Sequence, residues 1–448
     1  MRLKLPPKVE YIIDVLERHG WEAYAVGGCV RDSVLALEPK DWDITTSAKP
    51  EEVRRCFRRI IDTGIQHGTV TVMLENEGFE VTTYRIDGEY SDGRHPDQVI
   101  FTPNLRDDLM RRDFTINAMA YNPRVGLVDL YGGMQDLGRR VIRCVGDPDA
   151  RFTEDALRIM RAVRFAARFG FRIESATYQA IARHADNLRH VSAERIREEL
   201  VKTINSPHPE FFEELWRLGI TEIMLPEFDE TMKRQKEPLS EHMTVGAHSI
   251  RSMCEVPADT VLRMTMLLHE IKGADPETSL QENAAAGRKT PSPEESAEAA
   301  DAVLRRLRFD NDTRLRVVNL IRCRDLYLVP DEVVVRRALV KAGPDRFDDL
   351  LAMQWADFMA GGRELISQKQ QRLKDVYEVG RRILERGDCL SVKQLAINGT
   401  DLRKMGCEGK EIGRILKRAL LAVLENPSRN TREELLQYAE RLRRAGIS

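Results

Sequence analysis

The segments Gly27-Gly28-Cys29-Val30-Arg31-Asp32 and Asp41-Trp42-Asp43-Ile44-Thr45-Thr46 decide the expected fold of the N-terminal third. The short apolar run 22–26 precedes the glycine pair and is typical of a strand. Two glycines then close the strand and open a helix whose first amide groups point outward, which suits a phosphate group. A second strand is expected over 43–46. This order predicts an α/β unit with a phosphate-binding turn.

Asp41 and Asp43 are the predicted catalytic residues. Alternate residues of a strand point to the same side, so the two carboxylates are expected to converge. Mg²⁺ binds oxygen ligands and bridges triphosphate oxygens, and two such ions about 3.5–4 Å apart activate phosphoryl transfer. An isolated pair of this kind is usually a solvated turn. The glycine turn upstream and the charge of Arg31 favour a metal site for a nucleoside triphosphate.

Strand patterns are confined to the first third of the chain, and the rest is predicted to be helical. Strands are expected over residues 22–26, 43–46, 69–74 and 79–84, and helices near 7–19, 29–37 and 50–60. Leu, Arg, Glu and Ala dominate after Pro148, which indicates helices almost throughout. Prolines and a glycine predict a long loop over 273–295. The fold class is therefore α+β, a mixed sheet with helices followed by an all-α part.

Composition indicates a globular chain of two to four packed units. Its 448 residues exceed one ordinary domain, and 42% are hydrophobic while 32% are charged. No run of 18 apolar residues predicts a membrane span, and the N-terminus has no apolar signal core. Seven scattered cysteines without a CxxC pair favour a reducing cytoplasm. The oligomeric state cannot be predicted.

Basic charge is concentrated in two regions, although the net charge is only −2. Residues 139–205 hold 14 Lys and Arg against 9 Asp and Glu, and residues 372–448 hold 17 against 11. Such excess neutralises RNA phosphates, but it also occurs on ordinary solvated helix faces.

A helix is predicted to begin near Glu154 and to separate apolar from charged residues. Its core stripe comprises Ile159, Met160, Val163, Ala166 and Ala167. Its opposite side comprises Glu154, Asp155, Arg158, Arg161 and Arg164. Because Asp155 and Arg158 are three residues apart, we expect them to be neighbours, either as an ordinary ion pair or as a base-reading pair.

The second interpretation predicts a choice of nucleobase. Cytosine and adenine both present an amino donor beside a ring-nitrogen acceptor. A carboxylate accepts from the amino group and a guanidinium donates to the ring nitrogen. Uracil and guanine reverse these groups and would leave polar atoms unpaired, which gives strong rejection.

Together these motifs resemble class II CCA-adding tRNA nucleotidyltransferases and bacterial poly(A) polymerases. The resemblance covers about residues 20–205 and weakens toward the C-terminus. Besides the two opening segments, it rests on the motifs 92–96 (DGRHP), 111–118 (RRDFTINA), 154–158 (EDALR), 194–195 (ER) and, more weakly, 397–402 (INGTDL). It implies Mg²⁺ dependence, CTP and ATP as substrates, and a head, neck, body and tail. We expect these over 1–145, 146–205, 206–371 and 372–448.

The resemblance also implies a role for each matching residue. Asp41 and Asp43 would be the metal ligands. The nucleotide would be bound by Gly27, Gly28 and Arg31 at the triphosphate, by Arg111, Arg112, Asp113 and Asn117 at phosphates and ribose, and by Asp155 and Arg158 at the base, with Arg161 and Arg164 on the same helix face. Glu80 is a possible third carboxylate or base, or simply a residue of an edge strand.

Two further segments bear on the reaction. A flexible loop containing Asp92, Gly93, Arg94 and Pro96 resembles the one that relatives need to change from CTP to ATP. It is otherwise a solvent loop without function.

The body resembles an HD phosphohydrolase domain that has lost metal ligands. His248 and His269 remain and Asp325 is a possible third ligand, but Glu270 follows His269 where an aspartate is usual. We expect little hydrolase activity; the alternative is a metal site rebuilt with Glu270.

The sequence therefore predicts a nucleotidyltransferase that adds C, C and A to a tRNA 3′ end and releases pyrophosphate. The basic tail would grip the tRNA. Alternatives are a poly(A) polymerase, an A-adding enzyme that works with a separate CC-adding enzyme, and a catalytically dead RNA-binding protein.

Overall fold

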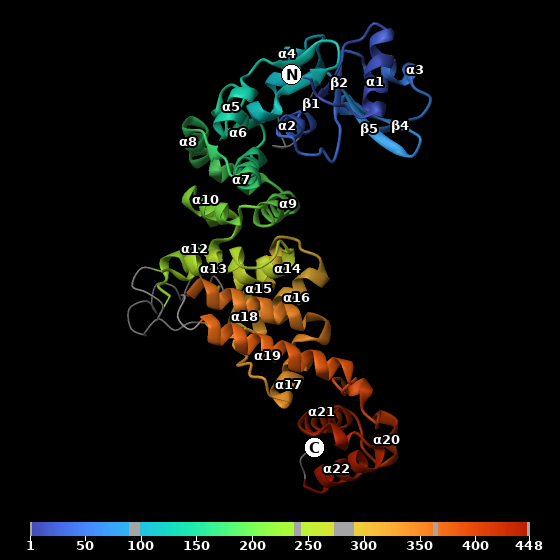
Figure 1. Cartoon of the computed structure of the whole chain (residues 1–448), viewed down its shortest axis with the longest axis vertical. Helices are drawn as coiled ribbons and strands as arrows, with labels where there is room; N and C mark the ends of the chain where they lie inside the picture. The colour runs from blue at the N-terminus through green and yellow to red at the C-terminus, as the bar shows by residue number, and fades with distance from the viewer. Residues whose placement is uncertain (1, 89–98, 237–242, 273–290, 362–365, 446–448) are drawn as a thin grey trace. The chain divides into compact units, whose positions relative to one another are not determined.

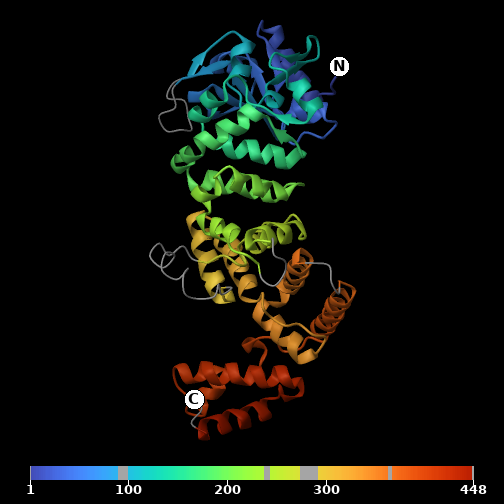
Figure 2. The ribbon, with the colours of Figure 1, turned by 90° about the vertical axis from the view of Figure 1, so that its left-hand side faces the viewer.

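The structure, a computed structural model, describes residues 2–88, 99–236, 243–272, 291–361 and 366–445. Its residue contacts divide the chain into two compact units, Met1–Pro226 and Glu227–Ser448. The first unit holds the large sheet, and the second is built from helices (Figure 1, Figure 2).

A seven-stranded mixed sheet forms the centre of the first unit. In spatial order its strands are β3 (Ile60–Gly64), β4 (Thr69–Leu74), β5 (Glu77–Thr83), β2 (Ile44–Thr46), β1 (Ala23–Val26), β8 (Met119–Asn122) and β9 (Gly126–Asp129). Strands β2 and β5 run parallel and the other pairs run antiparallel. The four strands expected from the sequence are all present in this sheet.

Strand β1 lies inside the sheet, and all four of its residues are buried. Its alternate residues Tyr24 and Val26 pack with Tyr84, Leu109 and other side chains in one apolar cluster. Two short ladders lie outside the large sheet: β6 (Arg85–Asp87) with β7 (Val99–Phe101), and β10 (Val141–Ile142) with β11 (Arg172–Ile173). The second ladder is a small exception to the all-helical pattern expected after Pro148.

Helices cover the sheet and continue beyond it. Those of the first unit are α1 (Pro7–Arg18), α2 (Gly28–Val34), α3 (Pro50–Cys56), α4 (Leu105–Met110), α5 (Gly133–Arg139), α6 (Pro148–Glu154), α7 (Leu157–Phe169), α8 (Ser175–His184), α9 (Ala193–Ile204), α10 (Phe212–Arg217) and α11 (Thr221–Met224). Helix α1 packs on β1 and β2, while α2 packs on β1, β8 and the short 3₁₀ turn η2 (Thr115–Asn117). These contacts bring the glycine turn and η2 together.

The helix expected from Glu154 onward is interrupted, which corrects the prediction. Helix α6 ends at Glu154, Asp155 has extended backbone angles, and α7 begins at Leu157. The Asp155 carboxylate accepts a hydrogen bond of 3.0 Å from the Leu157 amide, so it competes with helical bonding. The predicted core stripe of α7 is confirmed, since all five of its residues are buried.

The second unit is helical. Its helices are α12 (Pro226–Lys233, which begins at the boundary), α13 (Val245–Cys254), α14 (Thr260–Leu268), α15 (Pro293–Arg306), α16 (Asn311–Arg322), α17 (Glu332–Ala342), α18 (Phe347–Gly361), α19 (Ile366–Glu385), α20 (Gly399–Lys404), α21 (Lys410–Glu425) and α22 (Arg432–Arg444). The expected loop over 273–295 lies mostly outside the described residues. Its end is helical instead, because Ser292 and Glu295 form a capping box at the start of α15.

The α+β fold class is confirmed, and the sheet is confined to the first unit. The finer division at residues 145, 205 and 371 stays a prediction. Among the described residues, no helix has the length and hydropathy needed to cross a membrane.

Gly133 supplies a test of the packing of α5 against η2. A Cβ atom there would overlap the Thr115 carbonyl oxygen of η2, whereas one at Gly138 of the same helix would meet nothing within 4 Å. Gly133→Ala should therefore lower the free energy of unfolding by about 1–3 kcal/mol. Chemical denaturation measures this change. Gly138→Ala, the matched control, should be neutral or slightly stabilising, and equal effects of the two variants would contradict the packing.

Candidate functional site

The glycine turn brings the start of α2 beside an arginine. Gly27 has a positive φ of 82° and donates its amide hydrogen to the Met119 carbonyl oxygen at 3.1 Å. A Cβ atom at Gly27 would lie 3.0 Å from Arg112 Nη1. Both the backbone conformation and the close guanidinium therefore favour glycine at this position.

Three carboxylates gather where β2 and β5 lie side by side. Asp41 and Asp43 lie in the segment that leads into β2, so the expected strand begins one residue later, at Ile44. In the parallel register Ile44 pairs with Val81, which puts Glu80 next to Asp43 across the two strands. Glu80 thus lies inside the sheet, beside β2, rather than on an edge strand.

The pKa shifts reflect this crowding. Partial desolvation raises the pKa of Asp43, Arg112 opposes the rise, and the charge of Asp41 adds to it. Desolvation, followed by the charges of Asp43 and Asp41, raises the pKa of Glu80. Mutually repelling carboxylate oxygens are the donor set that a hard divalent cation stabilises. The residues therefore fit the metal that the resemblance implies.

A buried aspartate that the sequence analysis overlooked holds the two neighbouring arginines. Asp108 is fully buried and forms ion pairs with Arg111 at 2.6 Å and Arg112 at 3.2 Å. Burial alone would raise the pKa of Asp108, but the two arginines outweigh it and lower the pKa. Thr45 of β2 also donates to Asp108, at 3.1 Å. The spacings i+3 and i+4 on α4 were the available signal.

A second buried network joins η2 to α7 and α2. Asp113 accepts hydrogen bonds from Arg161 Nε and Nη2 at 2.9 and 2.6 Å, and from Asn117 Nδ2 at 2.9 Å. The Asn117 side-chain oxygen in turn accepts from Arg31. Burial alone would raise the pKa of Asp113, but Arg161 and Asn117 hold it well below its usual range.

Arg31 lies beneath the glycine turn, not at an open surface. Only 3% of it is exposed; it pairs with Asp32 at 2.7 Å and its guanidinium stacks against the rings of Phe165 and Phe169. Its charge is therefore already compensated. The expected contact of Arg31 with a triphosphate stays a prediction, and the described contacts give Arg31 a supporting position.

Asp155 and Arg158 are not paired with each other, because the helix is interrupted between them. Asp155 pairs with Arg195 of α9 at 3.0 Å. Arg158 pairs with Glu154 at 2.6 Å and donates to the Arg111 carbonyl oxygen at 3.0 Å. The ion-pair interpretation of their spacing is therefore wrong. Arg195 instead holds the Asp155 side chain, and Glu154 holds the Arg158 side chain.

The remaining predicted residues have separate environments. Arg164 pairs with Glu199 and lies over the Phe165 ring, with 4.0 Å from its guanidinium carbon to the ring centroid. The loop with Asp92, Gly93, Arg94 and Pro96 lies outside the described residues.

In the second unit the carboxylate beside the two histidines is not the one expected from the sequence. Asp325 has a side chain that is 65% exposed and pairs with Arg324. It is Asp357, overlooked in the sequence, whose carboxylate meets His248 and His269.

The Asp113 network predicts a pH-dependent stability. Because the folded pKa of Asp113 is depressed, its stabilisation is present above the unfolded pKa of about 3.9 and is lost as the pH falls further. Asp113→Asn should lower the free energy of unfolding at pH 7 by about 3 kcal/mol. Denaturation at several pH values should show this difference shrinking below about pH 4. The control Asp186→Asn, at an exposed ion pair, should change stability by less than about 0.5 kcal/mol. A pH-independent loss would contradict the network.

Parts of the chain match known protein families. Residues 23–143 match the poly A polymerase head domain, and residues 170–232 match the probable RNA- and SrmB-binding site of polymerase A. The CCA-adding enzyme of Lactobacillus helveticus is 52% identical over 208 residues, which are 46% of this chain and 52% of that protein. That of Lactiplantibacillus plantarum is 50% identical over 198 residues, 44% of this chain and 49% of that protein. The chain spans about half the length of the curated relatives it matches.

Solved structures resemble the whole chain. The Bacillus stearothermophilus CCA-adding enzyme in complex with CTP is 27% identical, with a TM-score of 0.74 over 99% of this chain and 100% of that one. The Thermotoga maritima CCA-adding enzyme complexed with tRNA, at 20% identity and a TM-score of 0.58 over 98% of this chain and 96% of that one, shares the fold. Over its head domain and its RNA-binding segment, the chain is therefore similar to poly(A) polymerases, and its curated relatives and solved neighbours are CCA-adding enzymes.

Proposed function

We propose that this protein is a CCA-adding tRNA nucleotidyltransferase, which transfers C, C and A from CTP and ATP to a tRNA 3′ end and releases pyrophosphate. The observation that carries the proposal is the group of three carboxylates, Asp41, Asp43 and Glu80, beside the Gly27 turn and Arg112. Curated relatives with about 50% identity over 44–47% of this chain are CCA-adding enzymes.

Asp41 and Asp43 would hold the divalent cation, for which we propose Mg²⁺ because every donor is a carboxylate oxygen. When bound, such an ion neutralises triphosphate charge and stabilises the developing negative charge on the leaving pyrophosphate. Glu80, whose pKa is raised by partial desolvation and by its acidic neighbours, would complete the negative site or accept the proton of the attacking 3′-hydroxyl.

Arg111 and Arg112 would bind phosphate oxygens. Asp108 fixes both guanidinium groups, which reduces the conformational entropy lost when a nucleotide binds. Gly27 leaves room for the Arg112 side chain at the turn. Asp113 and Asn117 are both at least nine-tenths buried. They would either hold η2 in place or bind the ribose after a local change in conformation.

Base choice would depend on Asp155 and Arg158. The carboxylate accepts from the amino group of cytosine or adenine, and the guanidinium donates to the ring nitrogen. Glu154 and Arg195 hold these two side chains separately. A carboxylate and a guanidinium that are each held in place would reject uracil and guanine, because the reversed donors and acceptors of these bases would be left unpaired. The loop with Asp92, Gly93, Arg94 and Pro96 would adjust the site between CTP and ATP.

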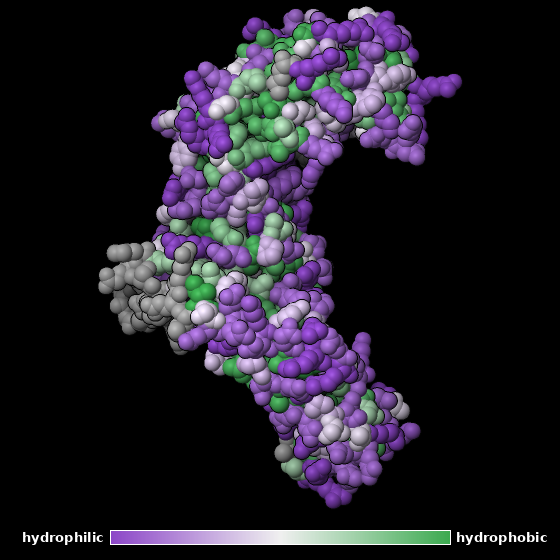
Figure 3. Space-filling view, in the orientation of Figure 1, coloured by the Kyte–Doolittle hydropathy of each residue, from purple (hydrophilic) through white to green (hydrophobic). Residues whose placement is uncertain are grey.

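The C-terminal helices would bind the tRNA. Residues 372–448 carry an excess of basic over acidic side chains, and the face visible in Figure 3 is mainly hydrophilic over α20 to α22. Phosphate contacts of this kind position a nucleic acid without reading its sequence. A cytoplasmic location agrees with the substrate and with seven free cysteines.

A poly(A) polymerase is the second candidate, because the matching head domain is named for that activity. It would use ATP alone and add many residues. An A-adding enzyme with a separate CC-adding partner would use only ATP as well, but would stop after one addition. The base-recognition argument favours CCA addition, since Asp155 and Arg158 suit both bases.

Substitution of the carboxylates tests the reaction. Asp41→Ala and Asp43→Ala should each slow nucleotide incorporation by about 1,000-fold or more, because several kcal/mol of charge stabilisation are removed. Labelled CTP and ATP measure the rate, and electrophoretic mobility shift should show unchanged tRNA binding. Glu80→Gln should also slow incorporation, whereas Glu77→Gln on the same strand should not. Near-normal turnover by both aspartate variants would exclude them from the metal site.

Base selection is tested by incorporation of the wrong nucleotides. Asp155→Ala and Arg158→Ala should reduce the preference for CTP over UTP and for ATP over GTP by about 10-fold or more, since a hydrogen bond to a charged group contributes roughly 1.5–3 kcal/mol. The surface variant Arg189→Ala should keep the wild-type preference. If both substitutions left the ratio of kcat/KM values unchanged, these residues would not read the base.

A further inference from the structure

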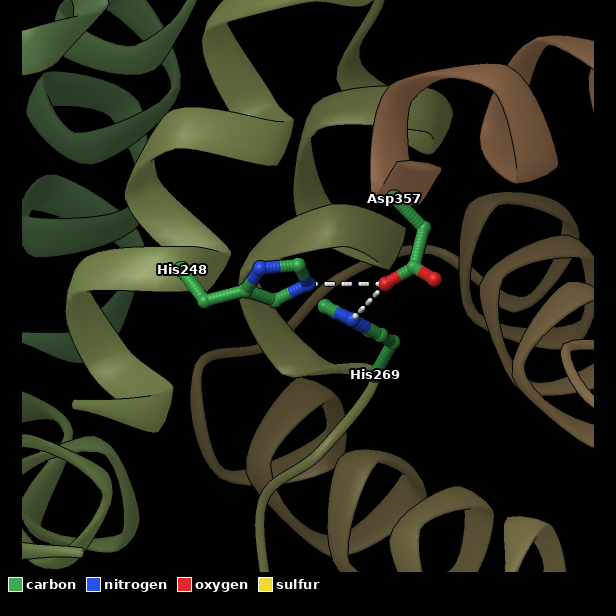
Figure 4. Close-up of side chains that lie close together, drawn as sticks. All are labelled: His248, His269 and Asp357. Carbon is green, nitrogen blue, oxygen red and sulfur yellow. Dashed lines mark hydrogen bonds and ion pairs between the residues drawn. The ribbon is translucent and has the colours of Figure 1, made fainter. Parts of the chain in front are cut away.

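In the second unit, two histidines and one aspartate converge on a single point. His248 lies on α13, His269 follows the end of α14, and Asp357 lies on α18, more than 80 residues further along (Figure 4). Asp357 Oδ1 is 2.8 Å from His248 Nε2 and 3.1 Å from His269 Nε2. All three potential ligand atoms lie within 4.8 Å of one another.

We propose that His248, His269 and Asp357 bind a divalent first-row transition-metal ion, independently of the head's metal site. Two imidazoles and one carboxylate form a common metal-binding set that leaves positions open for water or another ligand. Ligands about 2.1 Å from a metal lie roughly 3.0–3.5 Å apart, close to the two separations seen here. Imidazole nitrogens favour zinc, copper, iron or nickel over magnesium, and the carboxylate also suits manganese.

The second hydrogen bond of His269 supports a ligand role. Its Nδ1 is 2.6 Å from the Met266 carbonyl oxygen, which can only accept. Nδ1 therefore carries a proton, which leaves Nε2 as the nitrogen that can bind a metal ion. Nε2 faces Asp357 Oδ1 at 3.1 Å, so a proton or a metal ion between the two atoms would satisfy both. A backbone carbonyl that orients a histidine in this way is typical of metal sites.

His248 is a buried histidine whose hydrogen bonds are incomplete among the described residues. It is 1% exposed, and its Nδ1 has no hydrogen-bond partner among the described residues. Its contacts through Nε2 are to Asp357 and, at 3.4 Å, to the Ser252 hydroxyl. A buried imidazole without a partner for one nitrogen is costly. The other ring nitrogen, Nε2, faces Asp357 and is therefore the atom that would bind the ion.

Glu270 lies beside this group but has a different partner. Its Oε2 is 3.9 Å from His269 Nε2 and forms an ion pair with Lys236. Glu270 is therefore a neighbour of the site, and the third ligand is Asp357 instead. Because α13, α14 and α18 pack against one another, a bound ion would link three helices of one core. The inference is of binding; the low hydrolase activity expected from the sequence stays a prediction.

Manganese bound to the full-length chain tests the proposal. The double variant Asp41→Asn/Asp43→Asn removes the head's ligands, so remaining tight binding belongs elsewhere. Pulsed electron paramagnetic resonance should then detect nitrogen couplings from two imidazoles, which a site made only of carboxylates cannot give. This measurement needs no substitution in the second unit, so it does not depend on a variant that fails to fold.

Isothermal titration in the same background supplies the matched comparison. Asp357→Asn should weaken Mn²⁺ and Co²⁺ binding by about 100-fold or more, since it removes a direct ligand and even supporting partners cost 10- to 100-fold. Asp325→Asn, at the exposed carboxylate, should bind as the parent does, and circular dichroism should show both variants folded. Absence of imidazole couplings, or equal affinities of the two variants, would overturn the proposal.

Discussion

The buried carboxylate of Asp113 is the constraint on which the site depends. It is almost enclosed by protein, and its charge is balanced by Arg161 of α7 and by hydrogen bonds from Asn117 and the Phe114 amide. Asn117 extends the network to Arg31 and so to α2. Three segments far apart in sequence are thereby fixed relative to one another: the glycine turn, η2 and the helix that carries Arg158.

Around this anchor the site balances opposite charges at short range. Arg112 lies against Gly27, pairs with Asp108 and opposes the rise that burial causes in the pKa of Asp43. The carboxylate of Asp41 acts in the other direction and adds to the rise. The arginines compensate Asp108, which leaves the negative charge of the three clustered carboxylates for a cation. The same arrangement explains why Arg31, with its own partner Asp32, supports the turn from below.

Much of the first unit could be predicted from the sequence because its signals are local. The apolar run of β1, the glycine pair and the β4–β5 hairpin each specify their own conformation, and their order predicted the mixed sheet. The break before α7 was missed because Asp155 bonds to the backbone in a way that helical periodicity does not reveal. Side-chain pairing was also difficult to predict. Asp155 pairs with Arg195, and Arg158 pairs with Glu154. Only the folded structure shows these partners.

Long-range contacts were the hardest to predict, as the second unit illustrates. His248 and His269 stood out by residue type, but Asp357 is one of many aspartates and no spacing rule connects it to them. The choice of Asp325 rested on position in a motif, and the structure shows that residue exposed. The roles of Asp155 and Arg158 depend on a bound base, so they remain predictions.

The sequence of the product tests the central proposal most directly. A tRNA that lacks its 3′-terminal CCA should be incubated with CTP alone, ATP alone and both together, and its new 3′ ends sequenced. CCA addition predicts C additions with CTP, little extension with ATP, and one terminal CCA with both. Indifference to CTP and long A tracts with ATP would contradict it and identify a poly(A) polymerase.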